Sequence, residues 1–340
     1  MKKNRFLFLA VLFVALSFGF ASCDNVNEEL LERIEQLENQ LKDQQSGKDD
    51  DKTDSADKDG DKDTSSDNEQ NGDGTPDPDE GGSSDSPVSN FTPAAFSVSS
   101  TQQIYFSPGN LQYAQSTNTW SFAENQWECV GTDNVTGGSV YSDSSSGDGK
   151  EGTALANKMD LFGWSTSATN FGISTSTNQE TYYGSFVDWG TNVISDNAPN
   201  TWRTLTYKEW YYLLHTRTNA DALCGLAQVN GVNGLVFLPD HWICPASITF
   251  KSGFYGVYAA YQTFTADQWA ELEAAGAIFL PASGVRYGLH VLLVQLEGQY
   301  WSATEFNDND VSFFYISSFE ANMYSTSRTF GRSVRLVKDL

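Results

Sequence analysis

Residues 91–340 carry short apolar runs separated by Gly, Pro, Asn and Ser, a pattern typical of β-strands joined by turns. Asn230-Gly231 and Asn233-Gly234 predict the turns of a hairpin, because Asn-Gly pairs favour tight turns, and Pro108-Gly109 predicts another turn. The predicted strands cover residues 96–100, 104–106, 227–229, 235–239, 277–280, 289–296, 312–317 and 333–337.

Two other stretches have the period of an α-helix. Thr206 and Glu209 form a capping-box pattern ahead of an apolar stripe. Thr265 and Gln268 repeat that pattern, and Gly276 supplies a C-terminal stop. The sequence therefore predicts two helices.

Residues 132–195 consist mostly of Ser, Thr, Gly and Asn, which predicts long ordered loops. A few apolar residues are expected to anchor these loops: Leu161, Phe162, Trp164, Phe186 and Trp189. The predicted fold class is α+β, with a small, mostly antiparallel sheet, two helices and abundant loop. No linker divides residues 91–340, so they are expected to form one domain.

The first 22 residues have the pattern of a secretory signal, with basic residues, a short apolar run at 6–16 and small residues before Cys23. The apolar run is too short for a lasting span across about 30 Å of hydrocarbon. Ala-Ser-Cys resembles a bacterial lipobox, which would make Cys23 the lipidated first residue of the mature chain. The alternative is a Cys that happens to lie near an ordinary cleavage site.

A short helix is expected in residues 23–45 and an acidic, disordered linker in residues 46–90, where apolar residues almost vanish. Apolar residues in 27–41 follow an a/d spacing over about two heptads, which leaves open a weak homo-oligomer or a charged amphipathic helix. The Asp-rich stretches 57–61 and 71–74 lack the full spacing and the final Glu of a calcium loop, so a solvated spacer is the better interpretation.

Charge is unevenly distributed along the chain, whose formal net charge is −24. Residues 24–90 carry 6 basic and 22 acidic residues, and residues 91–340 carry 11 and 22. An acidic domain on an acidic tether repels nucleic acid, so no nucleic-acid partner is expected. Apart from Cys23, the sequence holds Cys129, Cys224 and Cys244; a Cys224–Cys244 bridge and unpaired thiols both remain possible.

Several short motifs carry a resemblance to a known family. The domain resembles Bacteroidetes surface lipoproteins that are similar to the Fibrobacter succinogenes major paralogous domain and, more remotely, to formylglycine-generating-enzyme-like C-type-lectin folds. The motifs lie at Phe106–Tyr113, Leu161–Trp164, Trp202–Thr206, Leu238–Trp242, Tyr300–Glu305 and Ser333–Val337. The resemblance implies a C-type-lectin-like domain over residues 91–340, and some such domains are variable proteins of diversity-generating retroelements.

The known chemistries of these relatives find no support in the residues. Formylglycine-generating enzymes use a late cysteine pair, whereas this chain has no Cys after Cys244. Calcium-dependent lectins use Glu-Pro-Asn or Gln-Pro-Asp with Trp-Asn-Asp; here Leu238-Pro239-Asp240 lacks the first ligand. His215, His241 and His290 have no metal-ligand spacing. We therefore expect no catalytic residues, no metal and no cofactor.

The segment 306–330 has the composition of an adaptable binding surface, rich in aromatic, Asn, Asp and Ser residues. Either Phe313 with Tyr315 or Phe314 with Ile316 is expected to face the core, because a strand alternates its faces. The candidate ligand-binding residues are the expected loop tips: Asn307, Asp308, Asn309, Asp310, Asn322, Tyr324, Ser325 and Arg328.

Together these observations predict an outer-membrane, lipid-anchored and surface-exposed protein whose C-terminal loops bind a glycan or a protein, on another cell or a phage. An anchored enzyme, either a hydrolase or a divergent oxidase that uses buried carboxylates, is the main alternative. A structural surface component without a ligand site is the third.

Overall fold

The computed structural model describes residues 94–135, 139–142, 155–254 and 258–340. Residues 85–340 form one compact unit. The predicted signal sequence, Cys23, the 27–41 heptads and the 46–90 linker lie outside the described residues. Within the described ranges, no helix has the length and apolarity needed to cross a membrane.

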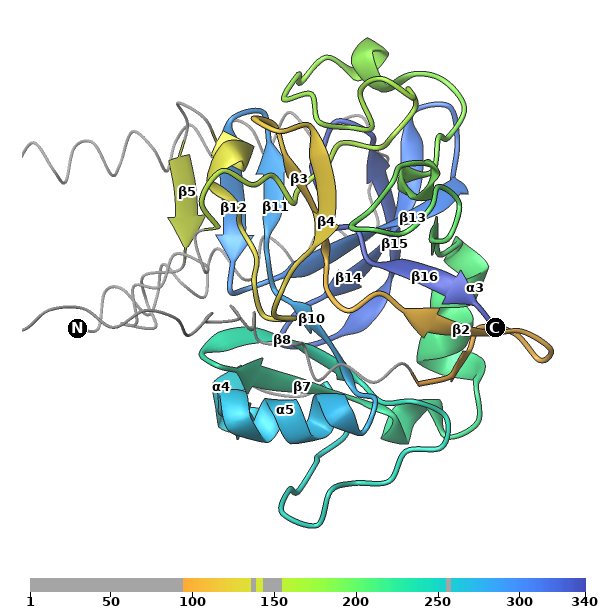
Figure 1. Cartoon of the computed structure of the whole chain (residues 1–340), viewed down its shortest axis with the longest axis vertical. Coiled ribbons are helices and arrows are strands. Elements are labelled where there is room, and N and C mark those ends of the chain that lie inside the picture. The colour runs from red at the N-terminus through yellow and green to blue at the C-terminus, as the bar shows by residue number, and fades with distance from the viewer. Residues whose placement is uncertain (1–93, 136–138, 143–154, 255–257) are drawn as a thin grey trace, which may run out of the picture. The chain divides into compact units, whose positions relative to one another are not determined.

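The first and last strands of the domain meet in one antiparallel sheet (Figure 1). Its strands, in order, are β1 (Phe96–Ser97), β2 (Gln103–Phe106), β16 (Leu336–Asp339) and β6 (Arg203–Thr204). Val337 pairs with Phe106, and Leu336 pairs with Thr204. The strands predicted near 96, 104–106 and 333–337 are confirmed, although β16 begins only at Leu336.

A second sheet has the order β10–β8–β7–β9. Its strands are β7 (Cys224–Val229), β8 (Val232–Phe237), β9 (Thr263–Phe264) and β10 (Ile278–Pro281). Asn230-Gly231 forms the predicted turn of the β7–β8 hairpin, with both residues at positive φ. The turn predicted at Asn233-Gly234 is wrong, because both residues lie inside β8. Gly234 instead permits close strand packing, since a Cβ there would collide with the Leu280 carbonyl oxygen.

The C-terminal half of the domain contains a meander of β13 (Gly298–Glu305), β14 (Asp310–Ile316) and β15 (Ala321–Ser327). Phe314 and Ile316 are fully buried on one face, so they are the pair that enters the main core. Trp210 stacks on Phe314 with ring centroids 4.9 Å apart. The opposite face carries Phe313, which is also buried, and Tyr315, which is only partly buried.

Two smaller sheets complete the described strands. One pairs β3 (Leu111–Ala114) with β4 (Thr119–Phe122), and the other has the order β11–β12–β5, with β11 at Val285–Tyr287, β12 at His290–Val294 and β5 at Ser139–Ser142. The β12–β5 and β7–β9 pairs are parallel, and the other strand pairs of the described chain are antiparallel. The predicted class, α+β with mostly antiparallel sheets, is confirmed.

Both predicted helices are present and begin at their capping boxes. Helix α3 (Tyr207–Tyr211) follows the N-cap Thr206 and continues as a π-helical turn, η5 (Tyr212–Thr216). Helix α5 (Ala266–Ala274) follows the N-cap Thr265. Shorter helical pieces are α4 (Tyr258–Tyr261) and the 3₁₀ turns η1 (Thr132–Val135), η3 (Gln179–Tyr182), η4 (Trp189–Thr191) and η6 (Ala220–Ala222).

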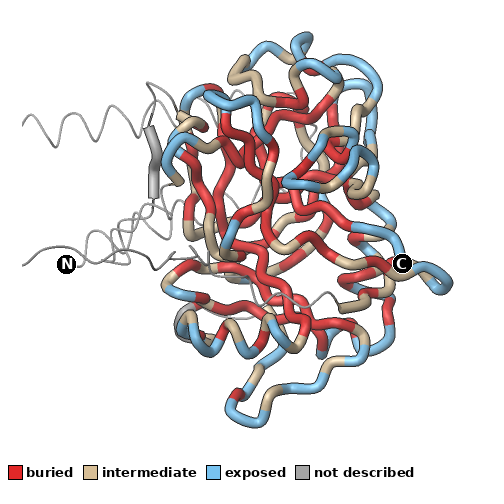
Figure 2. Tube along the Cα trace, viewed as in Figure 1, coloured by how far each residue is buried: buried red, intermediate tan, exposed pale blue. Residues whose placement is uncertain are grey.

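Much of the domain is loop, yet buried residues run through its interior (Figure 2). The predicted loop anchors Leu161, Phe162, Trp164 and Trp189 are fully buried, and Phe186 packs partly buried beside Trp164 and Trp189. Phe162, Trp164, Trp189 and Phe186 belong to one aromatic cluster with Trp301 and Phe313 of the meander, whereas Leu161 belongs to a neighbouring cluster. The prediction of long ordered loops is confirmed for the described part of 132–195.

Several buried arginines donate to main-chain oxygens of the loops. Five arginines of the described chain are at most 3 % exposed: Arg217, Arg286, Arg328, Arg332 and Arg335. Arg286 donates to the carbonyl oxygens of Leu161 at 2.9 Å, Ser174 at 3.0 Å and Gly288 at 3.2 Å. Because buried carbonyl groups need hydrogen-bond partners, such guanidinium groups stabilise loops that lack regular structure. Burial lowers the pKa of Arg335 to about 10.

Cys224 and Cys244 do not form a disulfide. The Cys224 thiol donates to the Ala220 carbonyl oxygen at 3.5 Å, and the Cys244 thiol donates to the Ile248 carbonyl oxygen at 3.3 Å. Strand β7 buries Cys224 completely, whereas Cys244 is exposed in the loop after β8, so the bridge considered from sequence is wrong. Burial raises the pKa of the Cys224 thiol to about 12.

Candidate functional site

The turn between β13 and β14 is held by its own polar groups. The Asn307 side-chain oxygen accepts the backbone N–H groups of Asn309 and Asp310, each at 2.8 Å. Its amide nitrogen donates to the Asp310 carboxylate at 3.1 Å. Asn307 and Asp310 therefore shape the turn, and their side-chain groups are largely used inside it. Phe306, Asp308 and Asn309 remain exposed.

A loop from the middle of the chain lies against this turn. Gln179, at the start of η3, donates to the Asn309 carbonyl oxygen at 2.9 Å. The Tyr183 hydroxyl donates to the Asn309 side-chain oxygen at 3.2 Å. Asn178 caps η3 and so fixes the direction of both side chains. We call Gln179, Tyr183, Phe306, Asp308 and Asn309 the tip surface.

Arg328 was predicted to lie at a loop tip. The structure instead places it beneath the tip surface. It is 3 % exposed and its guanidinium packs over the Trp164 ring at 4.8 Å. It donates to the carbonyl oxygens of Gly184 and Asn307, both at 3.2 Å, and lies 3.5 Å from the Glu305 carboxylate. The long Arg328 side chain donates to carbonyl oxygens of both loops and so joins them from below. The sequence gives no sign of these contacts, because they depend on how the loops fold together.

Helix α3 adds exposed aromatic side chains at the other flank of the β13 end. The Tyr207 backbone N–H donates to the Thr304 hydroxyl at 3.0 Å, two residues before Phe306. Tyr207 and Tyr211 are exposed and stack with their ring centroids 6.1 Å apart. His215 follows on the same side, 4.8 Å from Tyr211 between ring centroids.

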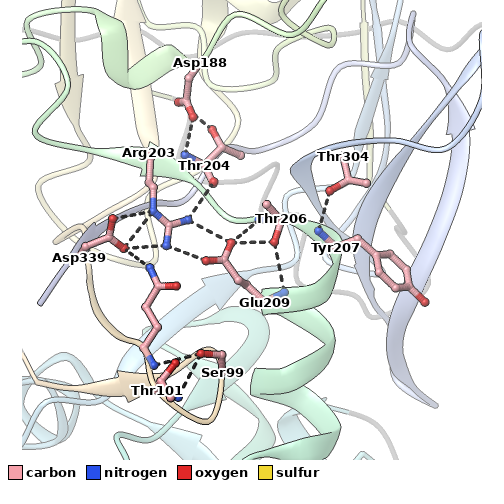
Figure 3. A network of polar contacts seen from close by, with 11 residues as sticks. Ser99, Thr101, Asp188, Arg203, Thr204, Thr206, Tyr207, Glu209, Thr304 and Asp339 are labelled. Carbon is pink, nitrogen blue, oxygen red and sulfur yellow. Dashed lines mark hydrogen bonds and ion pairs between the residues drawn. The ribbon is translucent and has the colours of Figure 1, made fainter.

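A polar network fixes α3 to the rest of the domain (Figure 3). Arg203 donates to the Asp339 carboxylate of β16 at 2.7 and 3.0 Å and to the Glu209 carboxylate at 2.6 and 3.0 Å. Glu209 also accepts the Thr206 backbone N–H at 2.7 Å and so completes the capping box. Asp188 accepts the Thr204 backbone N–H at 2.9 Å. The start of α3 is thereby tied to the last strand.

Replacing Asp339 by Asn is expected to lower the free energy of unfolding by less than about 1 kcal/mol at neutral pH, because solvent screens a half-exposed ion pair. Hydrogen bonding to Arg203 lowers the pKa of Asp339. A lowered pKa contributes stability above the unfolded value, about 4, and that stability is lost as pH falls through the folded pKa. Urea unfolding from about pH 7 to about pH 3 checks this: the difference between wild type and D339N should shrink in acid. A difference independent of pH would contradict it.

The remaining predicted residues do not join the tip surface. Asn322 lies opposite Tyr315 near the far end of β14, and Tyr324 lies opposite Phe313 at the middle of that strand. The Tyr324 hydroxyl donates to the Glu320 carboxylate at 3.0 Å, and partial burial together with that bond raises the pKa of Tyr324 to about 12. Ser325 pairs with Ser312, so strand alternation places it on the face opposite Tyr324.

The eight predicted residues thus divide among the turn, the buried layer beneath it and two faces of β15. Gln179, Tyr183, Tyr207 and Tyr211 were not predicted. No local signal identifies them, since Tyr183 is brought to Asn309 from 126 residues away in the sequence. The charges near the tip surface are mainly acidic, because Glu305 and Asp308 are exposed while Arg328 is buried.

The chemistry available to this site is non-covalent. Tyr183 and Phe306 offer aromatic area, while Gln179 and Asn309 offer amide groups at a fixed spacing. In the described ranges, no group of three His, Cys, Asp or Glu side chains is arranged to hold a metal ion. Comparisons with protein-family models, curated proteins and solved structures found no match to the chain.

Proposed function

We propose that this chain is a lipid-anchored, outer-membrane surface protein with a C-type-lectin-like head that binds a macromolecular ligand, a glycan or a protein, through the tip surface. The exposure of two large aromatic side chains carries the proposal: Phe306 is 64 % exposed and Tyr183 is 50 % exposed. Large aromatic side chains enrich binding interfaces because they supply contact area at low entropic cost.

The tip surface is pre-organised, which supports a role in binding. Asn307 fixes the turn from within, Gln179 and Tyr183 fix it from the side, and Arg328 fixes it from below. Little conformational freedom is then lost on association, and that raises affinity for a given contact area. The pairing of β2 near the start of the domain with the last strand β16, the two capped helices and the long ordered loops support the C-type-lectin-like assignment.

The anchoring part of the proposal rests on the sequence. The lipobox-like Ala-Ser-Cys23 supplies the lipid attachment, and three acyl chains on a bacterial lipoprotein Cys exceed what stable anchoring requires. The acidic linker, 46–90, would carry the head away from the membrane by roughly 35–40 Å, as expected for a flexible chain of this length. An outward-facing head at this distance could reach ligands on other surfaces.

Binding of the purified full chain to glycan and protein arrays tests the function. The double variant F306S/D308A removes an exposed ring and an exposed carboxylate but keeps Asn307, so the turn should persist. We expect at least tenfold weaker binding, about 1.4 kcal/mol or more. The matched control V193S/D196A changes an exposed apolar and an exposed acidic residue elsewhere and should bind like wild type.

Three results would contradict the proposal. Equal binding by F306S/D308A and wild type would remove the tip surface as the site. Cleavage of an array ligand would favour the enzyme alternative. Absence of any ligand on both arrays would favour a structural surface component.

A further inference from the structure

A separate cleft of about 360 Å³ lies between the β3–β4 hairpin, the 3₁₀ turn η1 and the loop before η3. Its lining residues are Tyr113, Gln115, Asp133, Met159, Thr169, Asn170, Ile173 and Ser174. None of them belongs to the tip surface. The volume falls in the range of small-molecule sites, about 300–1,000 Å³.

One wall of the cleft is apolar and rigid. Tyr113 and Met159 exchange backbone hydrogen bonds at 2.8 and 2.9 Å, which joins β3 to the segment before Leu161. The Trp120 ring packs behind Tyr113 with centroids 4.6 Å apart, and the Tyr113 hydroxyl donates to Asn118 at 3.0 Å. This wall therefore exists before any ligand arrives.

The cleft is also lined by polar side chains. The Asp133 carboxylate, the Gln115 amide and the Asn170 amide nitrogen form no hydrogen bond with another described residue. The Asn170 side-chain oxygen accepts the Ser174 backbone N–H at 3.0 Å, which fixes the direction of its amide. The Asp133 backbone N–H donates to the Lys158 carbonyl oxygen at 2.9 Å and so fixes the start of η1.

We propose that this cleft binds a neutral saccharide unit. A sugar ring has an apolar C–H face and a rim of hydroxyl groups, which matches a cleft lined by an aromatic ring, one carboxylate and two amides. Carboxylate and amide groups accept from and donate to hydroxyls with directional hydrogen bonds. Asp133 is the only charged lining side chain, so an anionic sugar is repelled. The site is independent of the tip surface and of the ligand found there.

Saturation-transfer NMR on the purified full chain tests the proposal. The probes are the methyl glycosides of glucose, galactose, mannose and N-acetylglucosamine, with N-acetylneuraminic acid as the anionic probe and tetramethylammonium as the cationic probe. At least one neutral glycoside should receive saturation, and the anionic probe should not. D133N, which keeps the shape of the side chain, is expected to weaken that binding about tenfold, as loss of a charge-assisted hydrogen bond does.

Two further variants make the result specific. Gln115 is exposed, and its described hydrogen bond uses its backbone oxygen, which Ala keeps, so Q115A should fold normally and bind the glycoside more weakly. D196N, at an exposed acidic position elsewhere, and F306S/D308A should both keep wild-type binding to the glycoside. Any of three results overturns the proposal: no saturation transfer to any of the four neutral glycosides, binding of tetramethylammonium alone, or unchanged glycoside binding in both D133N and Q115A. None of these results tests the tip surface, because its variants are compared separately by binding to the arrays.

Discussion

Arg286→Met is expected to lower the free energy of unfolding by on the order of 4 kcal/mol, because three buried or partly buried carbonyl oxygens each lose a hydrogen bond, although the Ser174 oxygen keeps the Tyr182 hydroxyl as a donor. The oxygens belong to Leu161, Ser174 and Gly288, on three separate segments. Methionine keeps much of the volume of the arginine side chain. The loss in unfolding free energy therefore measures the missing hydrogen bonds more than the cost of a cavity. Gly331 packs so closely that a Cβ there would lie 2.7 Å from the Arg286 side-chain nitrogen Nε, which leaves no space for rearrangement.

Urea unfolding measures this loss, and Arg203→Met is the matched control. Arg203 bonds mainly partly exposed carboxylates, so its replacement should cost only about 1 kcal/mol. Arg286→Lys should recover little of the stability, since an ammonium group lacks the planar fork that reaches several oxygens. Equal unfolding midpoints for the Arg286→Met and Arg203→Met variants would show that the buried guanidinium does not organise the loops.

Asp160→Ala is expected to cause the second largest loss in the free energy of unfolding, about 3–4 kcal/mol, because it leaves several buried hydrogen-bond donors without an acceptor. The carboxylate accepts the backbone N–H groups of Val130 and Gly131 at 2.8 and 2.9 Å and the Asn134 amide at 2.5 Å. Asp160 is fully buried. Thermal or urea unfolding measures the loss, and Asp196→Ala, at an exposed position, should be nearly neutral.

The stability difference between wild type and D160A also depends on pH, and the pKa shift of Asp160 determines the direction. Burial raises the pKa of Asp160, more than its hydrogen bonds lower it. A raised carboxyl pKa contributes stability that is fully present below the unfolded pKa, about 4, and is lost as pH rises through the folded pKa. The gap between wild type and D160A should therefore be wider near pH 4 than near pH 8. A gap that widens as pH rises would contradict this origin.

Short sequence patterns correctly predicted those elements that are stabilised by contacts within a few residues. The two capping boxes predicted α3 and α5, because Thr206 with Glu209 and Thr265 with Gln268 bond within one turn. Alternation predicted that either Phe313 with Tyr315 or Phe314 with Ile316 enters the core, and the structure shows that Phe314 and Ile316 do. The second Asn-Gly pair was misread, since its glycine is required by contact with Leu280 on a neighbouring strand and not by a turn.

The tip surface was predicted only in part, for the same physical reason. The composition of 306–310 indicated an exposed polar turn; residues 306–309 are exposed, whereas Asp310, predicted at the loop tip, is buried at the start of β14. Its lateral support by Tyr183 and its base at Arg328 depend on contacts across 126 and 21 residues of sequence. A composition cannot distinguish an arginine that reaches solvent from one that reaches a buried carbonyl oxygen, so Arg328 was expected at the surface.

The way Arg328 holds the tip surface determines which positions can change. Its guanidinium binds the peptide oxygens of Gly184 and Asn307, and a peptide oxygen is present in every residue type. Phe306 and Asp308 flank the held Asn307 peptide, and their side chains take no part in the bonds to Arg328. Substitution at these two positions therefore changes the exposed side-chain chemistry while leaving the backbone of the turn in place, whereas replacement of Tyr183 also removes a bond to Asn309.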